Sequence, residues 1–256
     1  MNWKTFFALL SRDGHVARRN LIPMLLQNLL QPMLFTFVFG RVMTTSGMLP
    51  QAYKNLLLPG IMAISMVMSG VWAVAMPLIS EFQFTREIED RLLAPIDTAW
   101  LAVQKVVGGM IQALVAGLVV LPAAWLMMGS GVNVDFGHLI EFLLVALLVA
   151  LFSAAGGLML GCSIGQTQVG LMFSLVLAPM MMFGCAYYPW KALDPFPVLK
   201  YAVLINPLVY ASEGLRGTLV PLAPHIDTLT VIAALALFDV TLLFFGLKKF
   251  NKKAVS

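Results

Sequence analysis

The sequence predicts an all-α integral membrane protein with six transmembrane helices. Hydrophobic residues make up 60% of the 256 positions and charged residues only 11%, and the mean hydropathy is +0.90. A spanning helix needs about 20 consecutive apolar residues, and roughly six such runs fit along the chain with short connections. The runs are continuous rather than alternating, which favours helices over the strands of a membrane β-barrel. Residues 1–256 are therefore expected to form a single transmembrane domain.

Residues 1–20 predict a helix that lies on the cytoplasmic membrane surface. An apolar patch that includes Phe6, Phe7 and Leu10 is flanked by Lys4 and by arginines. The patch is too short, and too charged downstream, for a signal peptide. Basic side chains beside lipid headgroups are typical of an interfacial amphipathic helix.

The first predicted span, residues 21–42, contains the amides Gln27, Asn28 and Gln31. Polar side chains this deep in a span face protein or a passage rather than lipid. Two interpretations stay open. The amides either form hydrogen bonds between helices, including those of a second copy of the chain, or line a transport pathway.

Residues 55–80, 100–128 and 139–163 predict the next three spans. Pro59 and Pro77 are expected to interrupt the first of these, and Lys105 is expected to extend back to the headgroups from the start of the second. Small residues recur every fourth position in two of the spans, which lets another helix approach closely. They are Gly109, Ala113 and Gly117 in one span, and Gly157, Gly161 and Gly165 at the end of the other.

Residues 81–97 carry more charge than any neighbouring stretch and lie between two long apolar runs. A charged side chain costs about 2.5 kcal/mol or more at a bilayer centre, so this segment must lie in water. As a helix it places Phe84, Ile88 and Leu92 on one stripe, and its charges form opposite pairs four residues apart before Pro95 ends it. It is either a solvated helix on the membrane surface or a docking helix for a soluble partner.

Residues 169–186 predict a fifth span, whereas residues 187–227 are rich in proline and broken into apolar pieces too short to cross. Such pieces are typical of re-entrant or interfacial helices on the outer side. Four polar side chains there recur at near-helical spacing, and they are Asn206, Tyr210, Glu213 and Arg216. This face is predicted either to form an outer gate, with Glu213 and Arg216 paired, or to cap and anchor a re-entrant hairpin.

The last predicted span, residues 228–247, contains Asp239 and is followed by four lysines. Basic residues concentrate on the side of both termini and of residues 81–97, which places all three in the cytoplasm. Asp239 is a candidate for a pathway, for a proton relay or for the dimer interface. Because no basic partner is found in an adjacent span, a structural hydrogen bond is the favoured interpretation.

Several enzyme classes find no support in the sequence. No phosphate-binding G-x-x-x-x-G-K-[ST] loop occurs, so ATP must be bound elsewhere. Residues 161–165 match G-x-S-x-G, but at the end of an apolar helix rather than at a strand-turn-helix elbow. The three histidines are dispersed, so no catalytic residue, metal or cofactor is expected, and nucleic acid is not an expected partner. Cys162 and Cys185 lie near opposite ends of successive spans, which argues against a disulfide.

Three features together resemble the permease subunit of an ABC-2-type transporter. They are the basic amphipathic N-terminal segment, the segment FTREIEDRLLAPI between the second and third spans, and NPLVYASEGLR at residues 206–216, preceded by Tyr188, Pro189 and Trp190. The last of these is the most specific, whereas the charged segment is informative mainly by its position. The resemblance covers essentially the whole chain.

This resemblance implies an ATP-driven exporter of a bacterial inner membrane. Two permease copies, surrounded by membrane lipids, would bind two cytoplasmic ATPase subunits that hold ATP and Mg. Residues 81–97 would be the coupling helix, with ATPase contacts at Phe84, Arg86, Glu87, Ile88, Glu89 and Arg91.

Such permeases export drugs, lipids or lipid-linked glycans, and spans rich in Met and Phe favour a hydrophobic or amphipathic substrate. The competing hypothesis is a self-contained proton-coupled carrier or a membrane-embedded enzyme centred on Asp239 or Ser163. A carrier built from inverted repeats should show comparable halves and several membrane carboxylates, and the sequence has neither.

Overall fold

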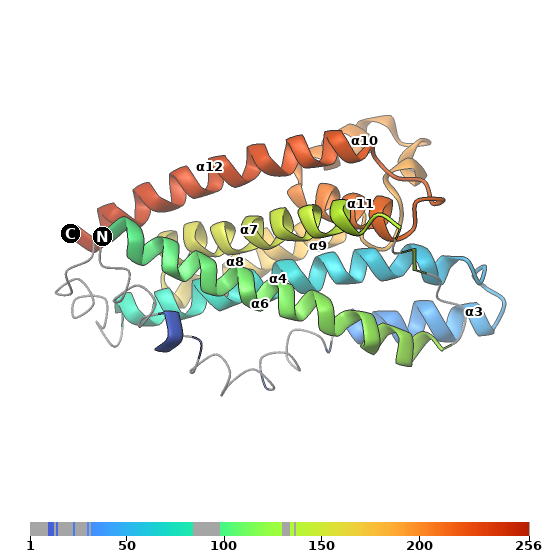
Figure 1. Cartoon of the computed structure of the whole chain (residues 1–256), viewed down its shortest axis with the longest axis horizontal. Helices are drawn as coiled ribbons and strands as arrows, with labels where there is room; N and C mark the ends of the chain where they lie inside the picture. The colour runs from blue at the N-terminus through green and yellow to red at the C-terminus, as the bar shows by residue number, and fades with distance from the viewer. Residues whose placement is uncertain are drawn as a thin grey trace.

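The computed structural model describes residues 10–12, 14, 23, 30, 32–83, 98–129, 134–135 and 137–255. All regular secondary structure in these ranges is helical. Four of the helices are long and apolar enough to cross a membrane, and they are α4 (Tyr53–Gln83), α6 (Thr98–Met128), α7 (Leu139–Ser163) and α12 (Thr228–Val255). They run along the longest axis of the molecule (Figure 1).

The remaining helices are short. Before α4 lie the π-helix η1 (Thr36–Val42) and α3 (Met43–Thr45). After α7 the chain forms η2 (Gln166–Gln168), α8 (Val169–Met172), the π-helix η3 (Phe173–Leu177) and α9 (Ala178–Met182). Four more precede α12, and they are η4 (Trp190–Leu193), α10 (Pro197–Ala202), η5 (Val203–Ile205) and α11 (Pro207–Leu219).

The two ends of the bundle differ in construction. At one end, here named the cap end, residues 183–227 fold into turns and short helices that include α10 and α11 (Figure 1). At the other, here named the C-terminal end, α4 and α12 finish and α6 begins. Thr98 Oγ1 donates a hydrogen bond to Asn251 Oδ1 at 2.8 Å, and the rings of Phe82 and Phe250 lie 5.9 Å apart.

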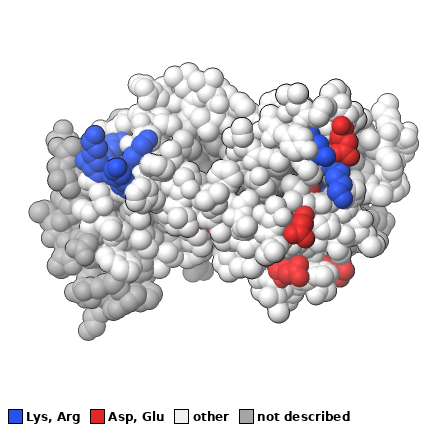
Figure 2. Space-filling model, turned by 90° about the horizontal axis from the view of Figure 1, so that it is seen from above, with Lys and Arg blue, Asp and Glu red and all other residues white. Residues whose placement is uncertain are grey.

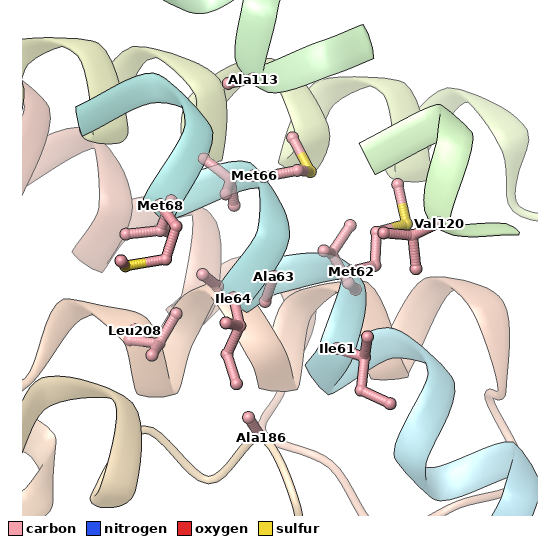
Figure 3. Close-up of a cluster of buried hydrophobic side chains, with 14 of the residues drawn as sticks. Ile61, Met62, Ala63, Ile64, Met66, Met68, Ala113, Val120, Ala186 and Leu208 are labelled. Carbon is pink, nitrogen blue, oxygen red and sulfur yellow. The ribbon is translucent and has the colours of Figure 1, made fainter. Parts of the chain in front are cut away.

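Helix α4 is the centre of the core because it is hydrophobic on all sides. Its most apolar stretch is 78% buried inside the protein, whereas that of α12 is 22% buried, so α12 is peripheral. Figure 3 shows Ile61, Met62, Ile64 and Met66 of α4 pointing in different directions toward neighbouring elements. Flexible Met side chains suit the irregular spaces between the helices.

The predicted close approach of small residues is confirmed at two of the helix contacts. A Cβ atom added to Gly117 of α6 would lie 2.7 Å from Met66 Cγ, and one added to Gly157 of α7 would lie 2.7 Å from the carbonyl oxygen of Val71. Both glycines therefore allow a neighbour on α4 to come nearer than a larger residue would permit.

Four predicted spans, residues 55–80, 100–128, 139–163 and 228–247, are confirmed as long apolar helices, and α12 continues well past Leu247. The predicted interruption by Pro59 and Pro77 is wrong, because α4 runs unbroken through both prolines. Neighbouring helices and local adjustments can satisfy the backbone groups that a proline leaves free inside a membrane helix.

The other two predicted spans are described only in part or are shorter than expected. Of residues 21–42, the structure describes a helical stretch from Pro32 onward. In place of residues 169–186, a run of short apolar helices ends at Met182 and residues 183–188 form a turn. Six spans therefore stay a prediction. The N-terminal helix and the segment after Gln83 lie largely outside the described residues.

Charge on the surface is concentrated at the two ends. Figure 2 shows basic side chains gathered at the C-terminal end, where α12 has Lys252 and Lys253 in its last turn. Acidic and basic side chains are mixed at the cap end, and a wide uncharged band separates the two groups on the visible face. This distribution is typical of a protein whose middle lies in lipid.

Candidate functional site

The residues of NPLVYASEGLR build the start and the core of α11. Asn206 is the N-cap of this helix: its Oδ1 accepts a hydrogen bond from the N–H of Leu208 at 3.0 Å, and Pro207 follows at the first helical position. The Asn206 Nδ2 donates to the carbonyl oxygen of Met180 at 2.7 Å. The cap thus fixes the start of α11 against the end of α9.

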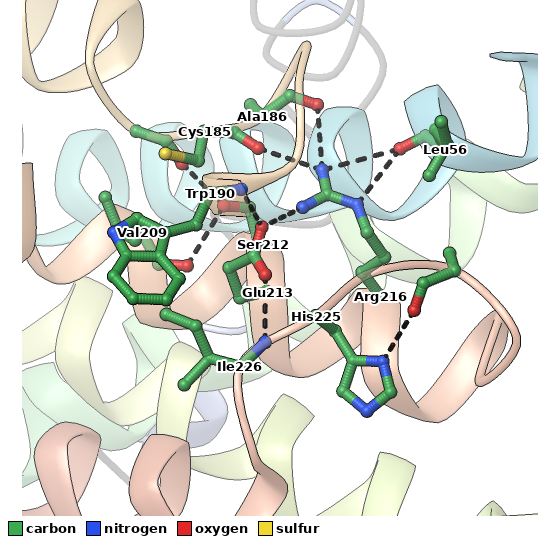
Figure 4. A network of polar contacts seen from close by, with 12 residues as sticks. Leu56, Cys185, Ala186, Trp190, Val209, Ser212, Glu213, Arg216, His225 and Ile226 are labelled. Atoms are coloured by element: carbon green, nitrogen blue, oxygen red, sulfur yellow. Dashed lines mark hydrogen bonds and ion pairs between the residues drawn. The ribbon is translucent and has the colours of Figure 1, made fainter. Parts of the chain in front are cut away.

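Glu213 and Arg216 form a fully buried ion pair within α11, three residues apart, and both side chains are 0% exposed. Glu213 Oε1 accepts a hydrogen bond from the Trp190 N–H at 2.8 Å, in addition to the bond from Arg216 Nη1. Glu213 Oε2 accepts one from the Ile226 N–H at 3.0 Å. One carboxylate therefore binds the segments before and after α11 (Figure 4).

Arg216 binds backbone carbonyls of two further segments. Its Nη2 donates to the carbonyl oxygen of Cys185 at 2.9 Å, and its Nε donates to that of Leu56 on α4 at 3.4 Å (Figure 4). Cys185 has a φ of 52°, which is uncommon for a residue with a side chain. The arginine holds this turn in place by satisfying its carbonyl group.

The same turn is held from the other side by the core. A Cβ atom on Gly60 of α4 would overlap the carbonyl oxygen of Ala186, so only glycine allows this approach. Ser212 of α11 also donates to the carbonyl oxygen of Gly184. Tyr53 Oη donates to the carbonyl oxygen of Tyr187 at 2.7 Å. Residues 184–187 are therefore clamped between α4 and α11.

The electrostatics of the pair follow from its burial. Helix α11 lies outside the four candidate spans, and burial raises the pKa of Glu213, while Arg216 and the N–H groups of Trp190 and Ile226 oppose this shift. A buried charge is tolerated when it is paired and its remaining lone pairs are hydrogen-bonded. Both conditions are met here.

The structure separates the four residues that the sequence placed on one face. Asn206, Glu213 and Arg216 bind the turns of the cap end, but the ring of Tyr210 lies 6.1 Å from that of Phe238 on α12. The partners Leu56, Trp190 and Ile226 were not foreseen, because each contributes a backbone group that leaves no mark in a sequence pattern.

A second buried ion pair lies at the C-terminal end. Lys105 Nζ of α6 donates to Glu81 Oε1 of α4 at 2.6 Å, with side-chain exposures of 6% and 8%. The prediction that Lys105 extends back to the headgroups is wrong, because Glu81 offers a charge partner inside the bundle. This pair joins the two helices that flank residues 84–97.

Asp239 differs from both pairs. Its side chain lies in α12 and is buried, with the residue 2% exposed, yet neither carboxylate oxygen has a hydrogen-bond partner among the described residues. The favoured sequence interpretation, a structural hydrogen bond, finds no partner among the described residues and stays a prediction. A charged Asp costs about 2.5 to 3.5 kcal/mol at a bilayer centre even on an insertion scale.

Other predicted site residues lie outside the described part of the chain. These are Gln27, Asn28 and Gln31 of the first span, and Phe84, Arg86, Glu87, Ile88, Glu89 and Arg91 of the charged segment.

Within the described residues, no three His, Cys, Asp or Glu side chains are grouped as metal ligands. Ser163 of the G-x-S-x-G match accepts a hydrogen bond from Lys249 Nζ at 2.8 Å, at the C-terminal end.

Comparison with known families decides what kind of protein carries this arrangement. The profile of the ABC-2 type transporter family matches residues 4–220, from the N-terminal segment to the end of α11. The chain belongs to the ABC-2 type transporter family. The predicted family is thereby confirmed, and the chain is the membrane subunit of a transporter. Permeases of this family typically work with an ATPase partner.

Two relatives extend the comparison beyond the family profile. The chain is similar to the inner membrane transport permease YadH of Escherichia coli strain K12, with 24% identity over 218 residues that cover 84% of this chain and 82% of the relative. It is equally similar to the inner membrane transport permease YadH of Shigella flexneri. The match of the family profile ends after NPLVYASEGLR, so α12 and Asp239 lie beyond it.

Proposed function

We propose that this ABC-2 type permease is the membrane subunit of an ATP-driven exporter in a bacterial inner membrane. The carrying observation is the family match over residues 4–220, which includes both the charged segment and the Glu213–Arg216 element. Inner-membrane residence is supported by the relatives named above and by the four long apolar helices. Both termini are proposed to lie in the cytoplasm, so the C-terminal end faces the cytoplasm and the cap end faces outward.

ATP and Mg are proposed to bind to a separate cytoplasmic ATPase, two copies of which join two permease copies. The chain has no phosphate-binding loop of its own. Residues 81–97 are the proposed coupling helix. Their position in the sequence supports this, because they connect the end of α4 to the start of α6 at the C-terminal end, where Glu81 and Lys105 join these two helices.

The proposed cargo is hydrophobic or amphipathic, such as a drug, a lipid or a lipid-linked glycan. The chain is rich in Met and Phe, with 17 of each, and such side chains adapt to varied apolar shapes. Stimulation of ATP turnover by lipids or lipophilic drugs in reconstituted bilayers is the expected result. Stimulation by a polymeric glycan donor alone would contradict this substrate class.

The experiment for the ATPase partnership is copurification from native membranes. Phe84→Ala and Ile88→Ala should each weaken docking of the ATPase about fivefold or more and lower its recovery, because about 1 to 3 kcal/mol of buried apolar contact is lost. Glu87→Lys should misalign the partner through like charges. The matched control is Val198→Ala at the cap end, where Val198 is 85% exposed on α10. Equal recovery from all four variants would contradict the docking assignment.

Pairing of two permease copies through the first span is a separate expectation. Single cysteines at positions 27, 28 and 31, in a chain whose native Cys162 and Cys185 are replaced, should crosslink into dimers. Exclusively monomeric products at all three positions would count against this interface.

One observation favours a second candidate function. Asp239, which has no hydrogen-bond partner in the part of the chain that the structure describes, is the kind of membrane carboxylate that a proton-coupled carrier uses. The two functions differ in their energy source. Transport by the purified chain alone, driven by a pH gradient without any ATPase, would establish the carrier and exclude the exporter.

A further inference from the structure

Asp239 lies on the face of α12 that packs against other helices. It is located between two levels of close helix contact, each of which involves a glycine. Near one level, a Cβ atom on Gly214 of α11 would lie 2.6 Å from Val231 Cγ1 and 3.0 Å from Val145 Cγ1. Near the other level, a Cβ atom on Gly246 would lie 3.2 Å from Leu158 Cδ2. Asp239 therefore sits about 10 to 12 Å along the axis from each level.

No charged residue of α7 lies between these levels. Residues 145–158 of α7 include one polar side chain, Ser153, and its hydroxyl donates to the carbonyl oxygen of Ala150 in its own helix. The lysines of α12 begin at Lys248, about 13 Å farther along the helix axis. Neither helix therefore supplies a counter-charge at the depth of Asp239.

The titratable and charged groups on the helices packed against α12 are Lys105 of α6, Glu141 and Cys162 of α7, and Tyr210, Glu213 and Arg216 of α11. Lys105 is bound to Glu81, and Arg216 is bound to Glu213. Glu141 and Cys162 lie in the first and last turns of α7, and the ring of Tyr210 packs on Phe238. Among the described residues, a negative charge on Asp239 therefore finds no counter-charge on these helices, unlike the charges of the two ion pairs.

Lipid-facing side chains flank this carboxylate on the other side of α12. Leu237, Val240 and Phe244 are 68%, 67% and 62% exposed, so an apolar surface reaches from the bilayer to the edge of the α7–α12 contact. Because α12 is the least buried of the four long helices, its apolar face is the one most accessible from the bilayer.

We propose that Asp239 binds the positive charge of a lipophilic or amphipathic cation that reaches it from the bilayer between α7 and α12. The role of this cation as cargo rests on the proposed export function. The site would narrow the proposed hydrophobic or amphipathic substrates to those that carry a positive charge. The carboxylate supplies the charge partner, and the exposed side chains of α12 accommodate the apolar part. The carboxylate binds either a proton or the cation, so binding of the cation to the protonated form releases the proton to water.

The test is equilibrium binding of tetraphenylphosphonium, a lipophilic cation with no proton to release, to the full chain in nanodiscs of zwitterionic phosphatidylcholine. Wild type should bind the probe saturably, and Asp239→Asn should bind it at least tenfold more weakly. Asp239→Glu should retain most of the affinity because it keeps the charge. Binding should also strengthen as pH rises, because protons and the probe compete for one carboxylate. Glu141→Gln, which removes a half-exposed carboxylate of the same bundle, is the control and should match wild type.

The possible outcomes decide between the alternatives. Equal affinity of wild type and Asp239→Asn, or no saturable binding to wild type, would overturn the cation site. A second contrary result would be an infrared carboxyl stretch that titrates with pH in wild type and is absent from Asp239→Asn, while both proteins bind the probe equally well. Asp239 would then bind only a proton. Recovery of the ATPase with Asp239→Asn is measured in parallel. Failure of any ATPase to copurify with wild type would remove the export function but leave the binding result standing.

Discussion

The two buried ion pairs of this permease lie at opposite ends of the bundle and are built differently. Glu213 and Arg216 sit in one helix and bind backbone groups of Leu56, Cys185, Trp190 and Ile226, which come from three separate stretches of chain. Glu81 and Lys105 come from two helices and join α4 to α6. The first pair ties loops into a fixed cap, whereas the second controls the spacing of the two helices that lead to the proposed coupling helix.

This difference indicates which end can move. If the cap end opened, each backbone group that Glu213 or Arg216 binds would lose its hydrogen bond in a site without water, which costs free energy. A change at the C-terminal end needs only a shift of one helix relative to its neighbour. The arrangement therefore favours the anchor interpretation of NPLVYASEGLR over the outer gate.

The largest expected effect comes from Arg216→Met. It leaves Glu213 buried without its charge partner and removes the donor to the Cys185 carbonyl group, so a loss of about 3 to 5 kcal/mol of stability is expected. Thermal unfolding in detergent and protein level in membranes are the measurements. Lys200→Met, which breaks a partly exposed pair with Asp194 at the same end, is the control and should cost about 0 to 1 kcal/mol. A stable Arg216→Met protein that no longer transports would favour the gate.

A smaller effect is expected from Glu81→Gln, which keeps an acceptor but removes the charge. A loss of about 1.5 to 3 kcal/mol is expected, together with fewer substrate molecules moved per ATP hydrolysed. Lys105→Met should behave alike, and the exchange Glu81→Lys with Lys105→Glu should restore part of the coupling. Lys249→Met, which removes an exposed lysine at the same end, is the control. If both single variants transport with normal yield per ATP, the pair has no role in coupling.

The smallest effect is expected at the N-cap of α11. Asn206→Ala should reduce stability by about 0.5 to 2 kcal/mol. Asn206→Asp should restore the part of this stability that comes from capping, because its side-chain oxygen still accepts the hydrogen bond from the Leu208 N–H. Any remaining deficit of the Asp variant reports the lost bond to Met180. Equal unfolding temperatures of wild type and Asn206→Ala would show that the cap is not a part of the anchor.

Much of this organisation could be predicted from local patterns. Continuous apolar runs identified the four long helices, and the three-residue separation of Glu213 and Arg216 identified their pairing. Patterns within one helix contain this information because the partners are neighbours in sequence.

Contacts between distant segments could not be predicted in this way. Lys105 and Glu81 are 24 residues apart and meet only because α4 and α6 pack side by side. Three further features likewise depend on the surrounding helices: the unbroken course of α4 through its prolines, the π-helical turns of η1 and η3, and the lack of a hydrogen-bond partner for Asp239 among the described residues. The sequence analysis assigned Glu81 to the charged segment after the span and Lys105 to the headgroups, so it did not pair them.

Hydrogen–deuterium exchange on the permease bound to its ATPase, with and without a non-hydrolysable ATP analogue, tests most directly whether the cap end is fixed and the C-terminal end moves. The N–H groups of Trp190 and Ile226 report on the cap, because Glu213 binds both of them. They should stay protected in both states, while amides in the last turns of α4 and the first turns of α6 should change their exchange rates. Loss of protection at Trp190 and Ile226 upon nucleotide binding, with no change at the C-terminal end, would contradict the account.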